Sequence, residues 1–180
     1  VVFSKDGKTL LLYPGGRPDK TYAVPEGVEK IEANLQNAAA LESLALPASM
    51  ISLPCTKILS RLKNVEVSAN NPAYKSLDGV VFSKDGAELL FYPPKREQEE
   101  YAIPEGTAVL GTDVFSKAVH LKTLALPLTL AELDTDDAVP ALEAFSVDDN
   151  HPAFFVRDGV LFSRDGEILV RYPEAKPGDT

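Results

Sequence analysis

The sequence holds one cysteine, Cys55, two histidines and no tryptophan in 180 residues. A single cysteine excludes a disulfide within the chain, and so few thiol and imidazole groups leave little material for nucleophilic catalysis or a transition-metal site. Basic residues are also scarce, since 18 Lys and Arg stand against 27 Asp and Glu, a formal net charge of -9. Nucleic acids and anionic membranes would repel such a chain, so neither is an expected partner.

Long apolar runs are missing as well. No run approaches the roughly 18 residues that a membrane helix needs, so we expect no direct insertion into a membrane. The sequence is 44% hydrophobic and 25% charged, which is ordinary for a globular chain with its own core. No phosphate-binding glycine loop, catalytic triad order or carboxylate pair stands out, and we therefore expect no catalytic residue, cofactor or metal.

A seven-residue phrase recurs three times and sets the organisation of the chain. VVFSKDG begins at Val1 and Val80, and VLFSRDG begins at Val160, at offsets of 79 and 80. The match continues through YAVPEG and YAIPEG, and through LESLALP and LKTLALP. Self-similarity at a fixed period indicates a single repeat array. We predict one array over 1–180, with a first unit at 1–79, a second at 80–159, and a third hairpin and tail at 160–180.

Each unit contains three short apolar segments that fit the pattern LxxLxLxxN. Alternation within this pattern predicts strands with one buried face. We expect the six strands to form one parallel sheet in sequence order, joined by short helical or irregular connections, within repeats at 20–74 and 99–154. The strands are expected near Val24, Leu46, Val67, Ile103, Leu126 and Val147. Eight side chains are expected in the core: Leu44, Leu46, Val65, Val67, Leu124, Leu126, Phe145 and Val147.

The phrase YKSLDGVVFSKDGAELLFYP predicts a β-hairpin inserted once per unit, at 1–14 and at 80–93. Asp-Gly is a strong turn signal, because glycine tolerates positive φ and aspartate bonds its own backbone. We expect Phe91 on the more exposed face, because Arg171 occupies the equivalent position. Because Val1 lacks the residues that precede Val80, we also expect the chain to be part of a longer polypeptide. The side chains expected to be buried are Phe82, Tyr92, Phe3, Tyr13, Phe162 and Tyr172.

The segments YAIPEGTAVLGTDVFSKAVHLKTLALP and NPAYKSLDGVVFSKDGAELLFYP resemble the BspA-type leucine-rich repeats of bacteria. The resemblance covers nearly the whole chain, although Leu35 and Ala118 depart from the family pattern. It implies an α/β repeat, a leucine-rich-repeat solenoid with a parallel β-sheet and inserted β-hairpins, located at the bacterial cell surface or secreted. A β-propeller fragment is the alternative fold, since Asp-Gly hairpins also mark propeller blades.

The same resemblance implies a non-catalytic module for adhesion or protein binding, with a host or cell-surface protein as partner. Two alternatives stay open. The array could be a structural spacer that displays another domain, or a glycan or cell-wall hydrolase, which would need an acid/base pair in a cleft. We expect the chain to be a monomer.

Several single residues invite a chemical role that their surroundings do not support. Cys55 is interpreted as a small structural residue, and His120 and His151 as surface or turn histidines. The acidic run Asp134–Asp137 and the segment Val147–His151 carry oxygen ligands that suit calcium. Neither has the alternating acids and glycine of a calcium loop, so both are interpreted as solvated.

The residues flanking each apolar pair predict an open face of the sheet. This face holds no aromatic or arginine side chain of the kind that dominates interface energies. We therefore expect it to bind weakly by itself and to depend on avidity. The candidate binding face consists of Lys20, Thr21, Ala23, Glu42, Ser43, Ala45, Lys63, Asn64, Glu66, Glu99, Glu100, Ala102, Lys122, Thr123, Ala125, Glu143, Ala144 and Ser146.

Overall fold

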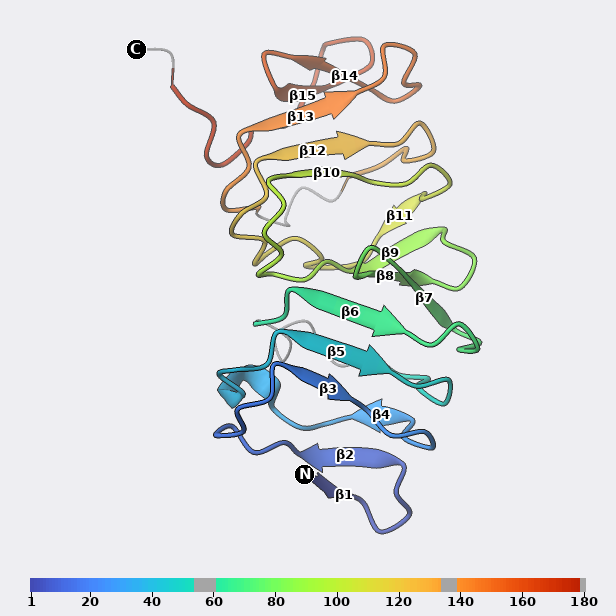
Figure 1. Ribbon diagram of the computed structural model, residues 1–180. Helices are drawn as coiled ribbons and strands as arrows, with labels where there is room; N and C mark the ends of the chain where they lie inside the picture. Colours follow the sequence, from blue (N-terminus) through green and yellow to red (C-terminus); the bar gives the residue numbers. More distant parts are fainter. Residues whose placement is uncertain (54–60, 134–138, 179–180) are drawn as a thin grey trace.

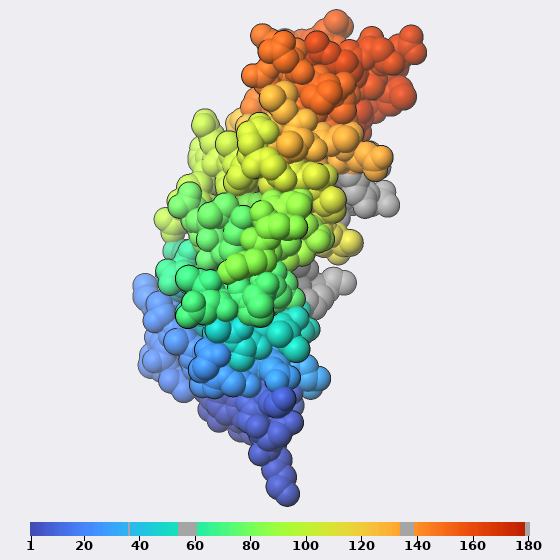
Figure 2. Space-filling model, turned by 90° about the vertical axis from the view of Figure 1, so that its right-hand side faces the viewer, coloured from blue at the N-terminus to red at the C-terminus, as the bar shows by residue number. Residues whose placement is uncertain are grey.

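The structure is a computed structural model that describes residues 1–53, 61–133 and 139–178. Its strands stack in chain order from the N-terminal hairpin to the C-terminal hairpin, and the molecule is elongated along this stack (Figure 1, Figure 2). In these residues the chain forms 16 strands, and its single helical segment is the 3-10 turn η1, Leu35–Asn37. No helix in the described ranges is long and apolar enough to cross a membrane.

Two three-stranded parallel sheets carry the leucine-rich segments. The first contains β3 (Thr21–Ala23), β5 (Ser43–Leu46) and β6 (Asn64–Val67). The second contains β10 (Glu100–Ala102), β12 (Thr123–Leu126) and β13 (Ala144–Val147). Within each sheet the strands are parallel and in sequence order. The six predicted strands are confirmed, and the antiparallel blades of a β-propeller are excluded.

The prediction of one continuous parallel sheet is wrong, because a hairpin sheet stands between β6 and β10. Its antiparallel strands are β7 (Tyr74–Leu77), β8 (Val80–Ser83) and β9 (Glu88–Phe91). The Val65 amide donates to the Gly79 carbonyl at 3.0 Å, and the Val67 amide donates to the Ser76 hydroxyl at 2.9 Å. Because these bonds occupy the edge of β6, β10 begins a new sheet.

Two further hairpins lie at the ends of the stack. The first pairs β1 (Val2–Phe3) with β2 (Thr9–Leu12), and the last contains β14 (Phe154–Arg157), β15 (Val160–Ser163) and β16 (Leu169–Arg171). Two short strands were not predicted from the sequence: β4 (Lys30–Ile31) pairs in parallel with β2, and β11 (Val109–Leu110) pairs in parallel with β9. Each of these two short strands therefore joins a hairpin to the leucine-rich repeats that follow it in the same unit.

Of the helical or irregular connections expected from the sequence, the described part of the chain shows irregular ones, apart from the short turn η1. Residues 112–117 form successive turns, in which Asp113 has a φ of 59° and its carbonyl accepts a bond from the Ser116 hydroxyl at 2.9 Å. A segment this short does not repay the cost of helix nucleation, and it must also reverse direction between strands. The α/β class is therefore corrected to a β-solenoid.

Two apolar clusters form the core, and they meet at the middle hairpin. Val81 and Phe91 belong to the first cluster, which lies under the first parallel sheet. Val80 and Phe82 belong to the second, which lies under the second sheet. All eight predicted core side chains lie in these clusters, although Val67 and Val147 are only partly buried. The middle hairpin is therefore covered on both faces.

The prediction that Phe91 lies on the more exposed face of the hairpin is wrong, since Phe91 is 3% exposed and Tyr92 is 2% exposed, so both faces are buried here. The inference from Arg171 failed because the Arg171 side chain is itself only 11% exposed and forms an ion pair with Glu174. Burial is confirmed for Phe82, Tyr92 and Tyr13, whereas Phe3 and Phe162 are half-buried and Tyr172 is exposed. The differences follow from position, because an end hairpin has a neighbouring unit on one face only.

Tyr92 lies in an aromatic cluster at the start of the second core. Its ring centre is 5.1 Å from that of Tyr101 and 5.2 Å from that of Phe115, and the Arg96 guanidinium lies 6.0 Å from it. Its hydroxyl is buried, and no described residue forms a hydrogen bond with it. Burial raises the pKa of Tyr92 to about 12, although the Arg96 charge opposes this shift.

We expect Tyr92→Phe to leave the free energy of unfolding at neutral pH within about 1 kcal/mol of wild type, because no hydrogen bond is lost. The two proteins should diverge in alkali. Tyrosines of the unfolded chain ionise near pH 10, so the stability linked to Tyr92 is complete below about pH 10 and is lost as pH rises toward its folded pKa. Urea unfolding over this pH range should show a smaller loss in the variant. Equal losses would contradict the prediction.

Candidate functional site

The predicted binding face lies outside both apolar clusters. None of its 18 residues is buried. The strand registers arrange them in rows across each sheet, with Thr21 opposite Ser43 and Ser43 opposite Asn64. The second sheet aligns Glu100, Thr123 and Ala144 in the same way. The placement is as expected, and a binding role for these residues remains a prediction.

A row of opposite charges runs along the starts of the strands. Lys20 contacts Glu42 at 3.3 Å, Glu42 contacts Lys63 at 3.6 Å, and Lys63 contacts Glu97 at 2.6 Å. The hydrogen bond to Glu97 raises the pKa of Lys63, and the same bond lowers the pKa of Glu97. In the second sheet Lys122 contacts Glu99 at 3.0 Å. Such exposed pairs add little stability, so the row is chiefly a charge pattern presented to solvent.

A stripe of small side chains runs beside the charged row. Ala23 and Ala45 are aligned in the first sheet, and Ala102 and Ala125 in the second. Over the first sheet the stripe forms the floor of a shallow hollow of about 310 Å³. Glu26 borders this hollow, where its carboxylate accepts bonds from the amides of the turn after β5. A partner could therefore approach the strand backbone closely here.

A notch that the sequence did not predict lies at the break between the two parallel sheets. It has a volume of about 750 Å³. One wall is the Arg96 side chain, which donates to the Asp78 carbonyl and lies 5.9 Å from the centre of the Tyr101 ring. Asp78 has a φ of 47°, which the Asp-Gly turn requires. The notch is lined by Lys63, Asn64, Asp78, Arg96, Glu97 and Gln98.

No family model and no curated protein matches this sequence. Solved structures do match. The pneumococcal vaccine antigen PcpA is 30% identical with a TM-score of 0.54, over 69% of this chain and 35% of the antigen's chain. A leucine-rich repeat protein from Eubacterium ventriosum is 19% identical with a TM-score of 0.52, over 72% of this chain and 42% of the other. A leucine-rich cell surface protein from Faecalibacterium prausnitzii is 18% identical with a TM-score of 0.51, over 71% and 41%.

The chain has the fold of bacterial leucine-rich-repeat proteins. The resemblance to bacterial surface proteins of this class is confirmed, and the identity of 30% to the antigen extends it from fold to sequence. The chain spans less than half the length of each structure that it matches.

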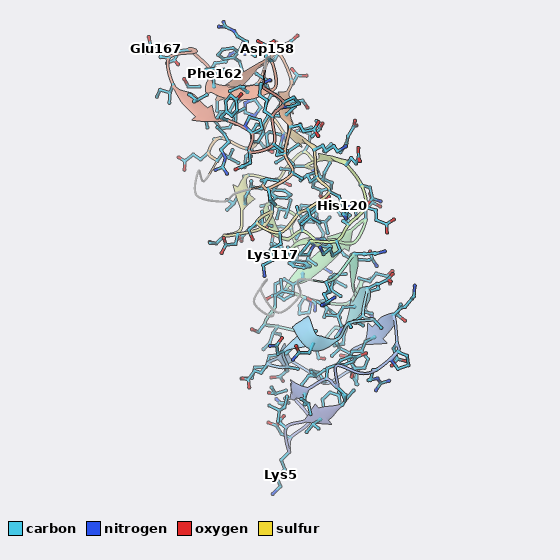
Figure 3. All side chains as sticks on the ribbon, turned by 90° about the vertical axis from the view of Figure 1, so that its left-hand side faces the viewer. Lys5, Lys117, His120, Asp158, Phe162 and Glu167 are labelled. Carbon is cyan, nitrogen blue, oxygen red and sulfur yellow. The ribbon has the colours of Figure 1, made fainter. Side chains whose placement is uncertain are left out.

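The remaining candidates have structural places in the leucine-rich-repeat array. His120 is exposed (Figure 3), as expected, whereas His151 is a turn residue that is fully buried and not at the surface. Asp148 accepts the Asn150 amide at 2.8 Å in the turn after β13. Cys55 and Asp134–Asp137 lie outside the described residues. In the ranges that are described, no group of three or more His, Cys, Asp or Glu side chains is placed to hold a metal ion.

Proposed function

We propose that the chain is a non-catalytic protein-binding module of a bacterial surface or secreted protein, and that its candidate binding face and notch contact the partner. The observation that carries the proposal is the notch, where Lys63 and Glu97 of the charged row line a recess large enough for a partner's side chains. The likeness to a vaccine antigen and to a cell surface protein supports a location outside the cell.

The chemistry of the face favours a protein partner. Lys63 and Arg96 lie in the same notch as Asp78 and Glu97, so both signs of charge are presented within one recess. Complementary charges of a protein surface can pair with such a pattern and fix the orientation of the complex. A chain with a net charge of -9 would repel a polyanion such as nucleic acid. An adhesive contact with a host protein therefore fits better than binding to nucleic acid.

A structural spacer remains the second candidate, and the charged row itself favours it. Glu42 is already engaged by Lys20 and Lys63, so a partner must compete with pairs inside the array. The face also lacks the aromatic anchors that dominate interface energies. We therefore propose that a single array binds weakly and that display of several copies supplies the affinity.

Binding should be measured by surface plasmon resonance against purified extracellular matrix proteins, with the chain presented singly and as a tetramer. We expect micromolar or weaker dissociation constants for the single chain. The apparent affinity of the tetramer should be about 10²- to 10⁴-fold higher. Ala45→Arg and Ala125→Arg should each abolish binding, because they block the small-residue stripe, whereas Ala108→Arg, an exposed alanine beside β11, is the matched control. Failure of the tetramer to bind any of these proteins would favour the spacer, and binding unaffected by both stripe variants would contradict the assignment of the face.

A further inference from the structure

The last hairpin exposes apolar side chains at positions that the middle hairpin buries. Leu89 and Tyr92 are 0% and 2% exposed, whereas Leu169 and Tyr172, one unit later, are 54% and 53% exposed. Because the residue types are identical, the difference comes from what covers them. In the middle hairpin they belong to the second cluster, together with Ile103, Phe115 and Leu124 of the repeats that follow it.

The backbone hydrogen bonds along the outer strands of these hairpins differ in the same way. The Ala87 carbonyl accepts the Ala108 and Val109 amides at 2.8 and 3.1 Å, and the Leu89 carbonyl accepts the Gly111 amide at 2.8 Å. In this way β11 covers the outer edge of β9, as β4 covers that of β2. In the part of the chain that the structure describes, β16 pairs with β15 alone. The third hairpin therefore presents an outer strand edge that is covered in the first two.

The segment after the last hairpin follows the same path as the segment after the middle hairpin. After β9 the Lys95 amide donates to the Leu62 carbonyl at 2.9 Å, and after β16 the Ala175 amide donates to the Leu142 carbonyl at 2.8 Å. Pro93 and Pro173 also accept equivalent turn bonds from Arg96 and Lys176, at 3.1 and 3.3 Å. A segment joined behind Lys176 would therefore reach the last hairpin from the side by which β10 reaches the middle one.

We infer that the C-terminal face, formed by Phe162, Leu169, Tyr172 and the outer edge of β16, is a docking surface for one further leucine-rich turn with the chemistry of residues 99–126. Such a turn supplies apolar side chains for the face and a short parallel strand for the edge. Figure 3 shows Phe162 and Glu167 at this end of the molecule, opposite Lys5. A second copy of the chain fits less well, because its own residues 99–126 already cover its middle hairpin.

The test is an extended chain in which a copy of residues 94–180 replaces residues 174–180, so that Pro173 takes the place of Pro93. We expect the added unit to fold on the C-terminal face. The urea m-value should then rise roughly 1.4-fold, since it scales with the surface exposed on unfolding. Nitration by tetranitromethane, mapped by mass spectrometry, should modify Tyr172 of the original chain and spare Tyr92. In the extended chain the nitration rate of Tyr172 should fall at least tenfold.

Leu169→Glu in the extended chain should restore the nitration of Tyr172 and return the m-value to that of the original chain. Leu12→Glu is the matched control, because Leu12 is 53% exposed at the opposite end. It should leave Tyr172 protected. In the original chain Leu169→Glu should not change the unfolding midpoint, which separates a docking defect from a folding defect. The inference is overturned if Tyr172 is equally reactive in the extended and original chains. It is also overturned if Tyr172 of the original chain becomes protected as protein concentration rises, since a second copy would then cover the face.

Discussion

Replacing Phe91 with alanine is expected to lower the free energy of unfolding by about 3–5 kcal/mol, the range for large aromatic side chains in a well-packed core. Phe91 is 3% exposed and packs in the first apolar cluster although it belongs to the hairpin that begins the second unit. Its removal would leave a cavity between the two units. The loss should therefore affect the unfolding of the whole array.

The matched control is Leu12→Ala at the equivalent position of the first hairpin. Leu12 is 53% exposed, so its truncation should cost less than about 1 kcal/mol. Urea unfolding of both variants, followed by circular dichroism, measures the difference. Similar losses in the two variants would show that the middle hairpin is not covered on both faces.

Replacing Asn71 with alanine is expected to cost about 3–5 kcal/mol, because four backbone groups, two buried and two partly buried, lose their partner. Asn71 is 0% exposed. Its amide nitrogen donates to the carbonyls of Pro47 and Met50 at 3.0 and 2.8 Å. Its amide oxygen accepts the amides of Ala73 and Tyr74 at 2.9 and 2.8 Å. The side chain thus joins the turn after β5 to the turn that begins the hairpin.

His151 performs the same task one unit later, which provides the control. Its Nε2 lies 3.0 Å from the Pro127 carbonyl, and its Nδ1 accepts the amides of Ala153 and Phe154 at 3.2 and 3.1 Å. Asparagine offers the same donor and acceptor, so His151→Asn should cost less than about 1.5 kcal/mol, whereas His151→Ala should cost about 3 kcal/mol. Thermal unfolding of the two variants measures both losses of stability. Equal losses would mean that the shape of the His151 side chain, and not its hydrogen bonds, accounts for its contribution to stability.

The repeat period and the alternation of apolar residues were enough to predict the six leucine-rich strands and the hairpins. Local patterns do not show which edges meet, and this is why the break between β6 and β10 was missed. It depends on the Gly79 carbonyl and the Ser76 hydroxyl, which take the place of a neighbouring strand. The strands β4 and β11 are two residues long, too short for any period to appear.

The candidate binding face could be predicted because it follows directly from strand alternation, whereas the notch could not. Lys63 and Glu97 are far apart in sequence and meet only because the hairpin between them folds back. Burial at Phe91 was mispredicted for a related reason. Aligning it with Arg171 assumed that a charged residue marks an exposed position, but Glu174 neutralises that charge in place.

Two positions of the repeated unit cannot change independently of each other. Phe91 and Pro94 occupy these positions in the middle unit, and Arg171 and Glu174 occupy the equivalent positions after the last repeat. Arginine alone at position 91 would bring a guanidinium into the first apolar cluster with no carboxylate beside it, which is strongly destabilising. A duplicated unit can pass from one pair to the other only if the acid arises first or both residues change together. The order of substitutions in the history of the array is therefore constrained by this single ion pair.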